Sequence, residues 1–189
     1  MTLDRILPYT KYILKKAVNL GDNVIDATVG NGNDTRYLSE LVGEDGRVFG
    51  FDVQQEAISN TKYKLDADNI QNVYLIHDGH ENVLKYISGE ISAAIFNLGY
   101  LPGSDKSVTT NGNTTWKAVI DILTLLKQGG IIVLVIYHGH EAGKMERDAI
   151  EMEVAKLDPA KTEVLRYEFL NKMDAPYVIV IERKCPPFR

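Results

Sequence analysis

Residues 23–35, which read NVIDATVGNGNDT, decide how this chain folds. Asn23 to Asp26 has the β-branched residues of a strand, a glycine turn follows at Gly30 and Gly32, and helical periodicity begins at about Thr35. Glycine lets the backbone approach a ligand closely, and the first N–H groups of a helix carry positive partial charge. The stretch therefore predicts a strand, a ligand-binding turn and a helix start, although a tight turn without a ligand would use the same glycines.

The alternation of strand and helix continues along the chain. The expected strands are 23–26, 47–52, 73–77, 93–97, 131–137, 163–169 and 177–182, and the expected helices are 8–18, 35–42, 55–67, 81–87 and 115–126. Only residues 170–176 separate the last two strands, too few for a crossover helix, so these strands should form an antiparallel hairpin. The sequence predicts an α/β fold: a seven-stranded, mostly parallel sheet with a C-terminal hairpin and helices on both faces.

The composition fits one domain over residues 1–184, with an N-terminal helix region over 1–20 and a tail over 185–189. The chain has 189 residues, 44% hydrophobic and 25% charged. It shows no apolar stretch of membrane length and no secretory signal, so we expect a cytoplasmic protein with no membrane partner. Its one cysteine, Cys185, allows no internal disulfide and no cysteine metal cluster. The net charge of -5 argues against a generic nucleic-acid coat, but local lysine clusters leave a nucleic-acid substrate open.

The glycine turn does not match two familiar phosphate-binding loops. A dinucleotide fingerprint would have a third glycine where Thr35 stands, and no Gly-Lys-Ser/Thr run follows for a nucleotide triphosphatase. Asp26 would repel a polyanion and suits an ammonium group better. Asp52 comes 20 residues after Gly32, at the distance where an acid accepts two ribose hydroxyls, and Gln54 can share that contact. Asp52 could also cap the next helix.

A polar cluster, His77-Asp78-Gly79-His80-Glu81, ends the third expected strand, where an adenine edge would lie. Metal ligation by His77, His80 and Glu81 would require a strand and a turn to present them on one side with no further histidine nearby. We therefore expect no metal.

Several of these features together resemble a class I S-adenosylmethionine (SAM)-dependent methyltransferase with its Rossmann-like fold. They are Asp26-x-Thr28-x-Gly30-x-Gly32, Asp52, Asn97 at the end of the fourth strand and the terminal hairpin, and the resemblance covers residues 20–184. Thr28 stands where the commonest first glycine of the loop would be.

Three more specific runs resemble one small bacterial family. These are NLGYLPG at 97–103, TTNG at 109–112 with Thr114, and YHGH at 137–140 followed by Gly143 and Lys144. The family is long labelled as rRNA methylases, but its members act as tRNA methyltransferases at the wobble uridine. The resemblance implies conversion of 5-aminomethyl-2-thiouridine to 5-methylaminomethyl-2-thiouridine, with SAM as the cofactor.

The resemblance also implies where the cofactor is held. The methionine end of SAM would lie beside Asp26, lined by Thr28, Gly30, Asn31, Gly32, Asn33 and Thr35. Asp52 and Gln54 would hold the ribose, and His80 with Glu81 would lie on the adenine side.

Methyl transfer needs a neutral amine held opposite the sulfonium, so the acceptor site should orient an N–H and receive a proton. We assign orientation to Asn97, with Tyr137 and His138 as its neighbours and His138 as the natural proton acceptor; His138 could also be purely structural. Tyr100 would stack on a splayed uridine or be a buried loop aromatic.

The expected partner is the anticodon arm of tRNA, gripped by the catalytic domain itself or by a homodimer. The candidate phosphate contacts are Lys11, Lys15, Lys16, Lys106, Lys144 and Arg147, which could otherwise be solubilising surface residues.

Other functions remain open at this point. Within methyltransferases the substrate could be rRNA or a small molecule. From other classes, an NAD-dependent oxidoreductase would use the same Asp52, and a non-catalytic SAM-binding or RNA-binding module would leave the polar runs around Asn97 and His138 without a task.

Overall fold

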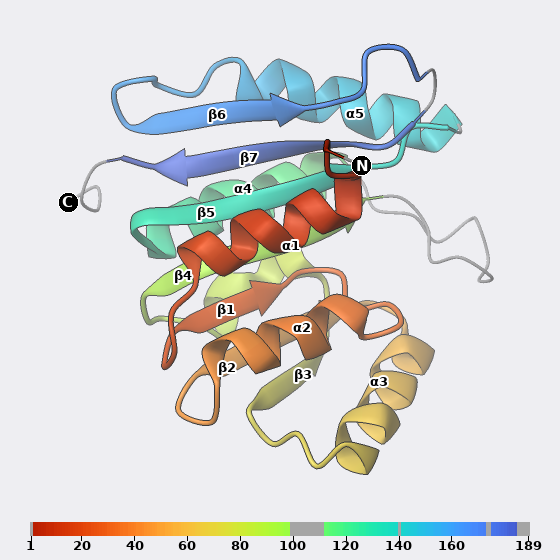
Figure 1. The fold of residues 1–189 in the computed structure, drawn as a ribbon, viewed down its shortest axis with the longest axis vertical. Helices are drawn as coiled ribbons and strands as arrows, with labels where there is room; N and C mark the ends of the chain where they lie inside the picture. The colour runs from red at the N-terminus through yellow and green to blue at the C-terminus, as the bar shows by residue number, and fades with distance from the viewer. Residues whose placement is uncertain (1, 99–111, 140, 173–174, 185–189) are drawn as a thin grey trace.

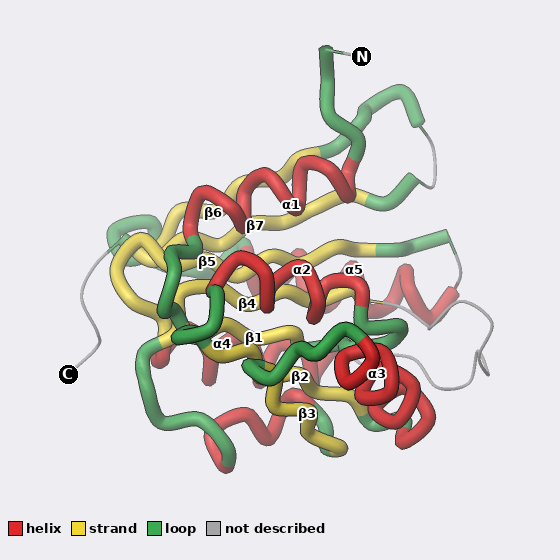
Figure 2. The backbone as a smooth tube through the Cα atoms, turned by 60° about the horizontal axis from the view of Figure 1, so that its bottom comes forward, coloured by secondary structure: helices red, strands yellow, loops and turns green. Residues whose placement is uncertain are grey.

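The computed structural model describes residues 2–98, 112–139, 141–172 and 175–184. Its strands form one sheet in the order β3-β2-β1-β4-β5-β7-β6. The strands from β1 to β5 pair in parallel, and β7 runs antiparallel to both β5 and β6. Figure 2 shows them side by side, from β3 at one edge to β6 at the other. The predicted α/β fold with its mostly parallel sheet and C-terminal hairpin is confirmed.

The elements lie close to the expected ranges. The strands are β1 (Asn23–Asp26), β2 (Arg47–Asp52), β3 (Val73–His77), β4 (Ile91–Leu98), β5 (Leu126–Ile136), β6 (Thr162–Tyr167) and β7 (Tyr177–Arg183). The helices are α1 (Ile6–Ala17), α2 (Asn33–Val42), α3 (Gln55–Ala67), α4 (Gly112–Leu125) and α5 (Glu141–Val154), with a 3-10 helix η1 (His80–Lys85).

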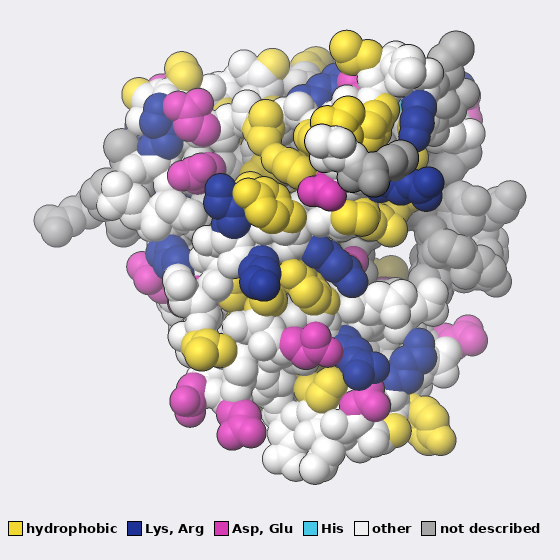
Figure 3. Space-filling model, in the orientation of Figure 1, with side chains coloured by type: hydrophobic (Ala, Val, Ile, Leu, Met, Phe, Trp, Pro, Cys, Tyr) yellow, Lys and Arg dark blue, Asp and Glu magenta, His cyan; other side chains and the backbone are white. Residues whose placement is uncertain are grey.

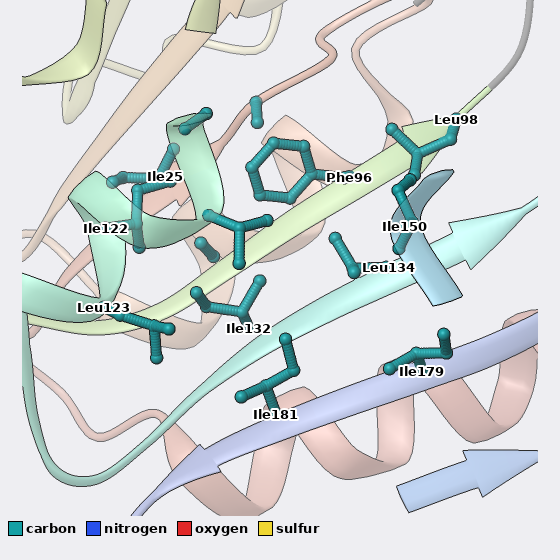
Figure 4. Packing of buried hydrophobic residues seen from close by; sticks show 14 of the residues in the cluster. Ile25, Phe96, Leu98, Ile122, Leu123, Ile132, Leu134, Ile150, Ile179 and Ile181 are labelled. Atoms are coloured by element: carbon teal, nitrogen blue, oxygen red, sulfur yellow. The ribbon is translucent and has the colours of Figure 1, made fainter. Parts of the chain in front are cut away.

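Two hydrophobic layers cover the two faces of the sheet. Alternate residues along a strand point to opposite faces, so Val133 packs with α1 and α2 while Ile132 and Leu134 pack with α4 and α5. In Figure 1, α1 and α2 accordingly lie in front of the sheet and α4 lies behind it. Figure 4 shows the rear layer, where Phe96 of β4 and Ile122 of α4 meet between the elements. The helices cover both faces, as predicted.

The structure corrects the expected elements in three places. Helix α5 was not expected, and a short 3-10 helix over 80–85 replaces the helix expected over 81–87. The periodicity of the first helix favours an apolar face through Ile6, Tyr9, Ile13 and Ala17, but the buried line of α1 runs through Ile6, Thr10 and Leu14, and Tyr9, Ile13 and Ala17 are only partly buried. Thr10 can occupy the buried line because its hydroxyl donates to the carbonyl of Ile6 at 2.9 Å.

Among the described residues, the model contains no helix that is both long and apolar enough to cross a membrane.

Candidate active site at the carboxyl edge of the sheet

The parallel strands end together, and this sets the place of the site. Asp26, at the end of β1, pairs with Ile95 of β4, and Asn97 of β4 pairs with Val135 of β5. Tyr137 and His138 follow β5 directly, and the Tyr137 N–H donates to the carbonyl of Leu98 at 3.3 Å. The carboxyl edge of an open α/β sheet is where such folds place their ligands.

The conformation of the glycine loop is fixed by an acid from the neighbouring strand. Gly30 and Gly32 have φ of 51° and 77°, in the left-handed region that favours glycine. The Gly30 N–H donates to Asp52 Oδ2 at 2.8 Å, and the Gln54 N–H donates to Asp52 Oδ1 at 2.9 Å. A Cβ at Gly32 would lie 2.7 Å from the Thr61 side chain. Asp52 therefore links the predicted methionine and ribose regions. Any ribose contact would be added to the two hydrogen bonds that Asp52 accepts from Gly30 and Gln54.

Asp26 is fully buried beneath this loop. Its oxygens accept hydrogen bonds from Thr35 Oγ1 at 2.6 Å and from the Thr28 N–H at 3.1 Å. Burial, with a further contribution from the negative charge of Asp34, raises the pKa of the Asp26 carboxyl to about 7. Asp26 thus supports the loop from below, and its predicted closeness to the methionine end stays a prediction.

Asp34 is a site residue to which sequence reasoning gave no role. It stands in the first turn of α2, where the positive end of the helix favours a carboxylate. Its Oδ2 accepts a hydrogen bond from Asn97 Nδ2 at 2.7 Å. Burial raises the pKa of the Asp34 carboxyl, and the Asn97 bond and the Lys11 ammonium counteract that rise. Because Nδ2 faces Asp34, the amide of Asn97 has one defined orientation.

Thr28, which follows β1, is bonded to β4, since its Oγ1 accepts the Asn97 backbone N–H at 2.8 Å. A glycine at position 28 would lack this hydroxyl. The departure from the commonest loop pattern therefore has a structural reason: Thr28 fastens the glycine loop to the end of β4.

Tyr137 and His138 border Asn97 on the β5 side. Burial and the charge of Asp34 raise the pKa of the Tyr137 phenol. His138 Nε2 lies 2.9 Å from the carbonyl oxygen of Ala175. A carbonyl can only accept, so the neutral imidazole carries its proton on Nε2 and keeps a lone pair on Nδ1. Among the described residues, that buried Nδ1 has no hydrogen-bond partner.

The predicted adenine side contains a second histidine of the same kind. His80 Nδ1 lies 3.0 Å from the carbonyl oxygen of Ala27, and Nε2 is buried without a partner in the described part of the chain. Burial lowers the pKa of His80, which keeps the ring neutral. Glu81 lies in the first turn of η1, and its backbone carbonyl accepts a hydrogen bond from Lys117 Nζ. His77 instead lies against the carbonyl of Val53, away from the contact made by His80.

Asn31 and Asn33 are exposed on the outer side of the loop. They line, with Thr61 and Lys64 of α3, a hollow of about 210 Å³ between α2 and α3. Lys64 Nζ donates to the carbonyl of Asn31 at 2.8 Å. This hollow flanks the loop, whereas Asp52, His80 and Asn97 stand at the strand ends.

The candidate phosphate contacts fall on two faces. Lys11, Lys15 and Lys16 are exposed on α1, in front of the sheet in Figure 1, whereas Lys144 and Arg147 belong to α5, which packs on the opposite layer. Arg147 forms an ion pair with Asp148 at 2.7 Å, so its charge is partly compensated. Tyr100 and Lys106 lie outside the described residues.

No group of three or more His, Cys, Asp or Glu side chains that could hold a metal occurs within the described ranges.

Comparison with known proteins shows what this chain is similar to. A family model described as "Putative rRNA methylase" matches residues 48–182. A chloroplastic tRNA (mnm(5)s(2)U34)-methyltransferase of Arabidopsis thaliana is 32% identical over 183 residues, which cover 91% of this chain and 67% of that protein.

Solved structures of similar proteins point to the same kind of enzyme. The crystal structure of a "putative rRNA-methylase" from Clostridium thermocellum is 44% identical with a TM-score of 0.95, covering 97% of this chain and 100% of that one. A "putative methyltransferase" from Streptococcus mutans, solved in complex with SAH, is 40% identical with a TM-score of 0.89, covering 96% and 99%.

Proposed function

Because this chain belongs to the family of "Putative rRNA methylase" proteins and is a SAM-dependent methyltransferase, we propose that it methylates tRNA. The proposed reaction converts the 5-aminomethyl group of the wobble 2-thiouridine to 5-methylaminomethyl, in the anticodon arm of tRNA. The choice of an amine acceptor rests above all on one observation: Asn97 is held by Asp34 at the carboxyl edge, beside the glycine loop. The choice of tRNA is supported by the name of the Arabidopsis relative. The proposal keeps the cytoplasmic location that the sequence suggests.

The residues at the edge fit the cofactor. The open glycine loop would accommodate the methionine end, and Asp52 at the end of β2 would accept the ribose hydroxyls. The unpartnered lone pair on His80 Nε2 suits an amino group such as the one on adenine. When bound, SAM supplies an electrophilic methyl group on a sulfonium.

The acceptor side of the site fits an amine. With its Nδ2 committed to Asp34, Asn97 would present its amide oxygen to a substrate N–H. The amine must lose a proton to attack, and the lone pair on His138 Nδ1 would receive it. Tyr137 would close the site beside them. An rRNA base or a small molecule carrying an amine would meet the same groups, so substrate identity needs a direct test.

That test is methylation of defined RNAs by the purified protein. We expect SAM to yield 5-methylaminomethyl-2-thiouridine in tRNA isolated from cells that lack this modification step, as measured by nucleoside mass spectrometry. Ribosomal RNA from the same cells serves as the competing substrate, and an Asn97→Ala protein serves as the inactive control. Methylation of rRNA alone, or of no RNA by a protein that binds SAM, would refute the tRNA assignment.

A further inference from the structure

One surface next to the site carries three of the candidate phosphate contacts and takes no part in the methyl transfer itself. It joins the exposed side of α1 to the start of the loop between β6 and β7, and we call it the tyrosine-lysine face. Its members are Tyr9, Lys11, Tyr12, Lys15, Lys16, Tyr167, Phe169 and Lys172. Figure 3 shows basic side chains interspersed with hydrophobic ones on the side of the molecule that carries α1.

The aromatic rings on this face form a continuous row. Tyr9 of α1 stacks on Tyr167 of β6 with ring centroids 3.8 Å apart and planes within 10°. Tyr12 extends the row on one side at 6.4 Å from Tyr9, and Phe169 extends it on the other at 6.0 Å from Tyr167. Tyr12 is 53% exposed, although an aromatic ring of this size gains by being covered. The row therefore presents an open ring at its end.

Lysines lie over these rings. Lys16 Nζ is 5.5 Å from the Tyr12 ring centroid, and Lys172 Nζ is 4.6 Å from that of Phe169. Helix α1 has three lysines and no acidic residue, in a chain whose net charge is -5. The face is therefore a local concentration of positive charge mixed with aromatic surface.

The face also reaches the acceptor edge. The positive charge of Lys11 acts to lower the pKa of the Asp34 carboxyl, against the larger effect of burial, which raises it. At its other end, the loop that begins with Phe169 continues to Ala175, whose carbonyl binds His138. In Figure 1 the start of α1 lies at the side of the sheet where β4 and β5 end, so a chain lying along the face could run toward Asn97 and His138.

We propose that the tyrosine-lysine face binds the single-stranded loop of the RNA substrate, with a base stacked on Tyr12 and phosphates beside Lys11, Lys15 and Lys16. Aromatic side chains alternating with cations are what unpaired nucleotides require, since every base has a face that stacks and every linkage carries a negative charge. A second copy of this chain, bound through the same face, is disfavoured as occupant because two basic surfaces would be brought together. The inference deepens the proposed RNA function and rests on it.

Binding of a fluorescently labelled anticodon stem-loop, measured by anisotropy over a range of salt concentrations, tests the face directly. We expect Tyr12→Ala to weaken binding about fivefold to a hundredfold, the range for loss of one stacked base, and Tyr12→Phe to retain it. Tyr63→Ala, which removes an exposed tyrosine from α3, is the matched control. Lys15→Gln with Lys16→Gln should make the slope of log affinity against log salt shallower by about 1.4, with Lys62→Gln as its control.

Each outcome decides a separate point. Unchanged melting temperature and SAH affinity would show that the variants are folded. If they bind RNA as the wild type does, with the same salt slope, the face is not the RNA contact, even if the wild type methylates tRNA. If they instead shift only the monomer-dimer equilibrium in sedimentation, the face serves self-association and the proposal is wrong. Failure of the wild type to methylate tRNA would count against the proposed function, whatever the binding result.

Discussion

Replacing Asp34 by Asn should slow methyl transfer while leaving the fold intact. The two side chains have nearly the same shape, but the substitution removes the charge that accepts from Asn97 Nδ2 at 2.7 Å and lets the two amides pair in either orientation. A charge-assisted hydrogen bond of this length is worth about 1.5 to 3 kcal/mol. Asp34 is half-buried, so solvent weakens the bond and the lower part of that range applies, which corresponds to a kcat about 10-fold to 30-fold lower.

The assay is the single-turnover rate of tRNA methylation at saturating SAM and tRNA. A second measurement does not depend on substrate: the side-chain amide resonances of Asn97, assigned with Asn97→Ala, should titrate with Asp34 in the wild type. Because the pKa of Asp34 is raised, that transition should lie above the usual range for aspartate, and it should be absent in Asp34→Asn. Glu40→Gln, on the exposed side of the same helix, should leave both readouts unchanged. A wild-type rate in Asp34→Asn would refute the positioning role.

Three further changes have defined outcomes. Between pH 3.8 and about 7, the Asp26 carboxyl stays protonated in the folded protein and is ionised in the unfolded chain, so unfolding releases a proton. The free energy of unfolding should therefore fall by up to about 4 kcal/mol as pH rises through this window. Urea unfolding should show that Asp26→Asn lacks this fall, and an unchanged fall would assign it to another group. Asp52→Ala should weaken SAM binding by about 1.5 to 3 kcal/mol in calorimetry, because it removes the ribose acceptor and releases the Gly30 N–H; equal affinity would contradict this placement. His138→Ala should be slow at neutral pH and recover partly as pH rises and the substrate amine becomes neutral, whereas a rate deficit independent of pH would make His138 structural.

Much of the fold followed from local pattern. Helix α3 and the strands β1, β2 and β3 have the expected bounds, because glycine or polar residues interrupt a clear periodicity at most of their ends. Helix α5 was missed because its buried line includes Glu146 together with Ile150 and Val154, and a carboxylate in that line breaks the apolar pattern. The Glu146 carboxylate accepts a hydrogen bond from Thr115 Oγ1 of α4. Periodicity does not reveal such a contact between two helices.

The candidate site was predictable in outline and incomplete in detail. Spacing placed Asp52, Asn97 and His138 at strand ends, since parallel strands share a carboxyl edge. Spacing does not predict which way an individual side chain points. The bond between Asp34 and Asn97 joins residues 63 positions apart, and its existence depends on how α2 begins over β1 and β4. The loop sequence itself offered one signal, an acid in the first turn of a helix that starts at a ligand-binding edge.

The strand order has a consequence for how the chain is synthesised and folds. The central strand β1 is completed early, but one of its two partners, β4, comes about 69 residues later, the separation at which Thr28 binds the Asn97 N–H. At roughly 5 to 20 residues per second, the ribosome needs about 3 to 14 seconds to make that stretch, during which β1 has an open hydrogen-bonding edge. An unpaired strand edge is a template for pairing with another chain, so the nascent chain is open to aggregation during this interval. Because Asn97 at the end of β4 is part of the site, the complete SAM site would form only after β4 docks, and cofactor binding would then stabilise the closed sheet.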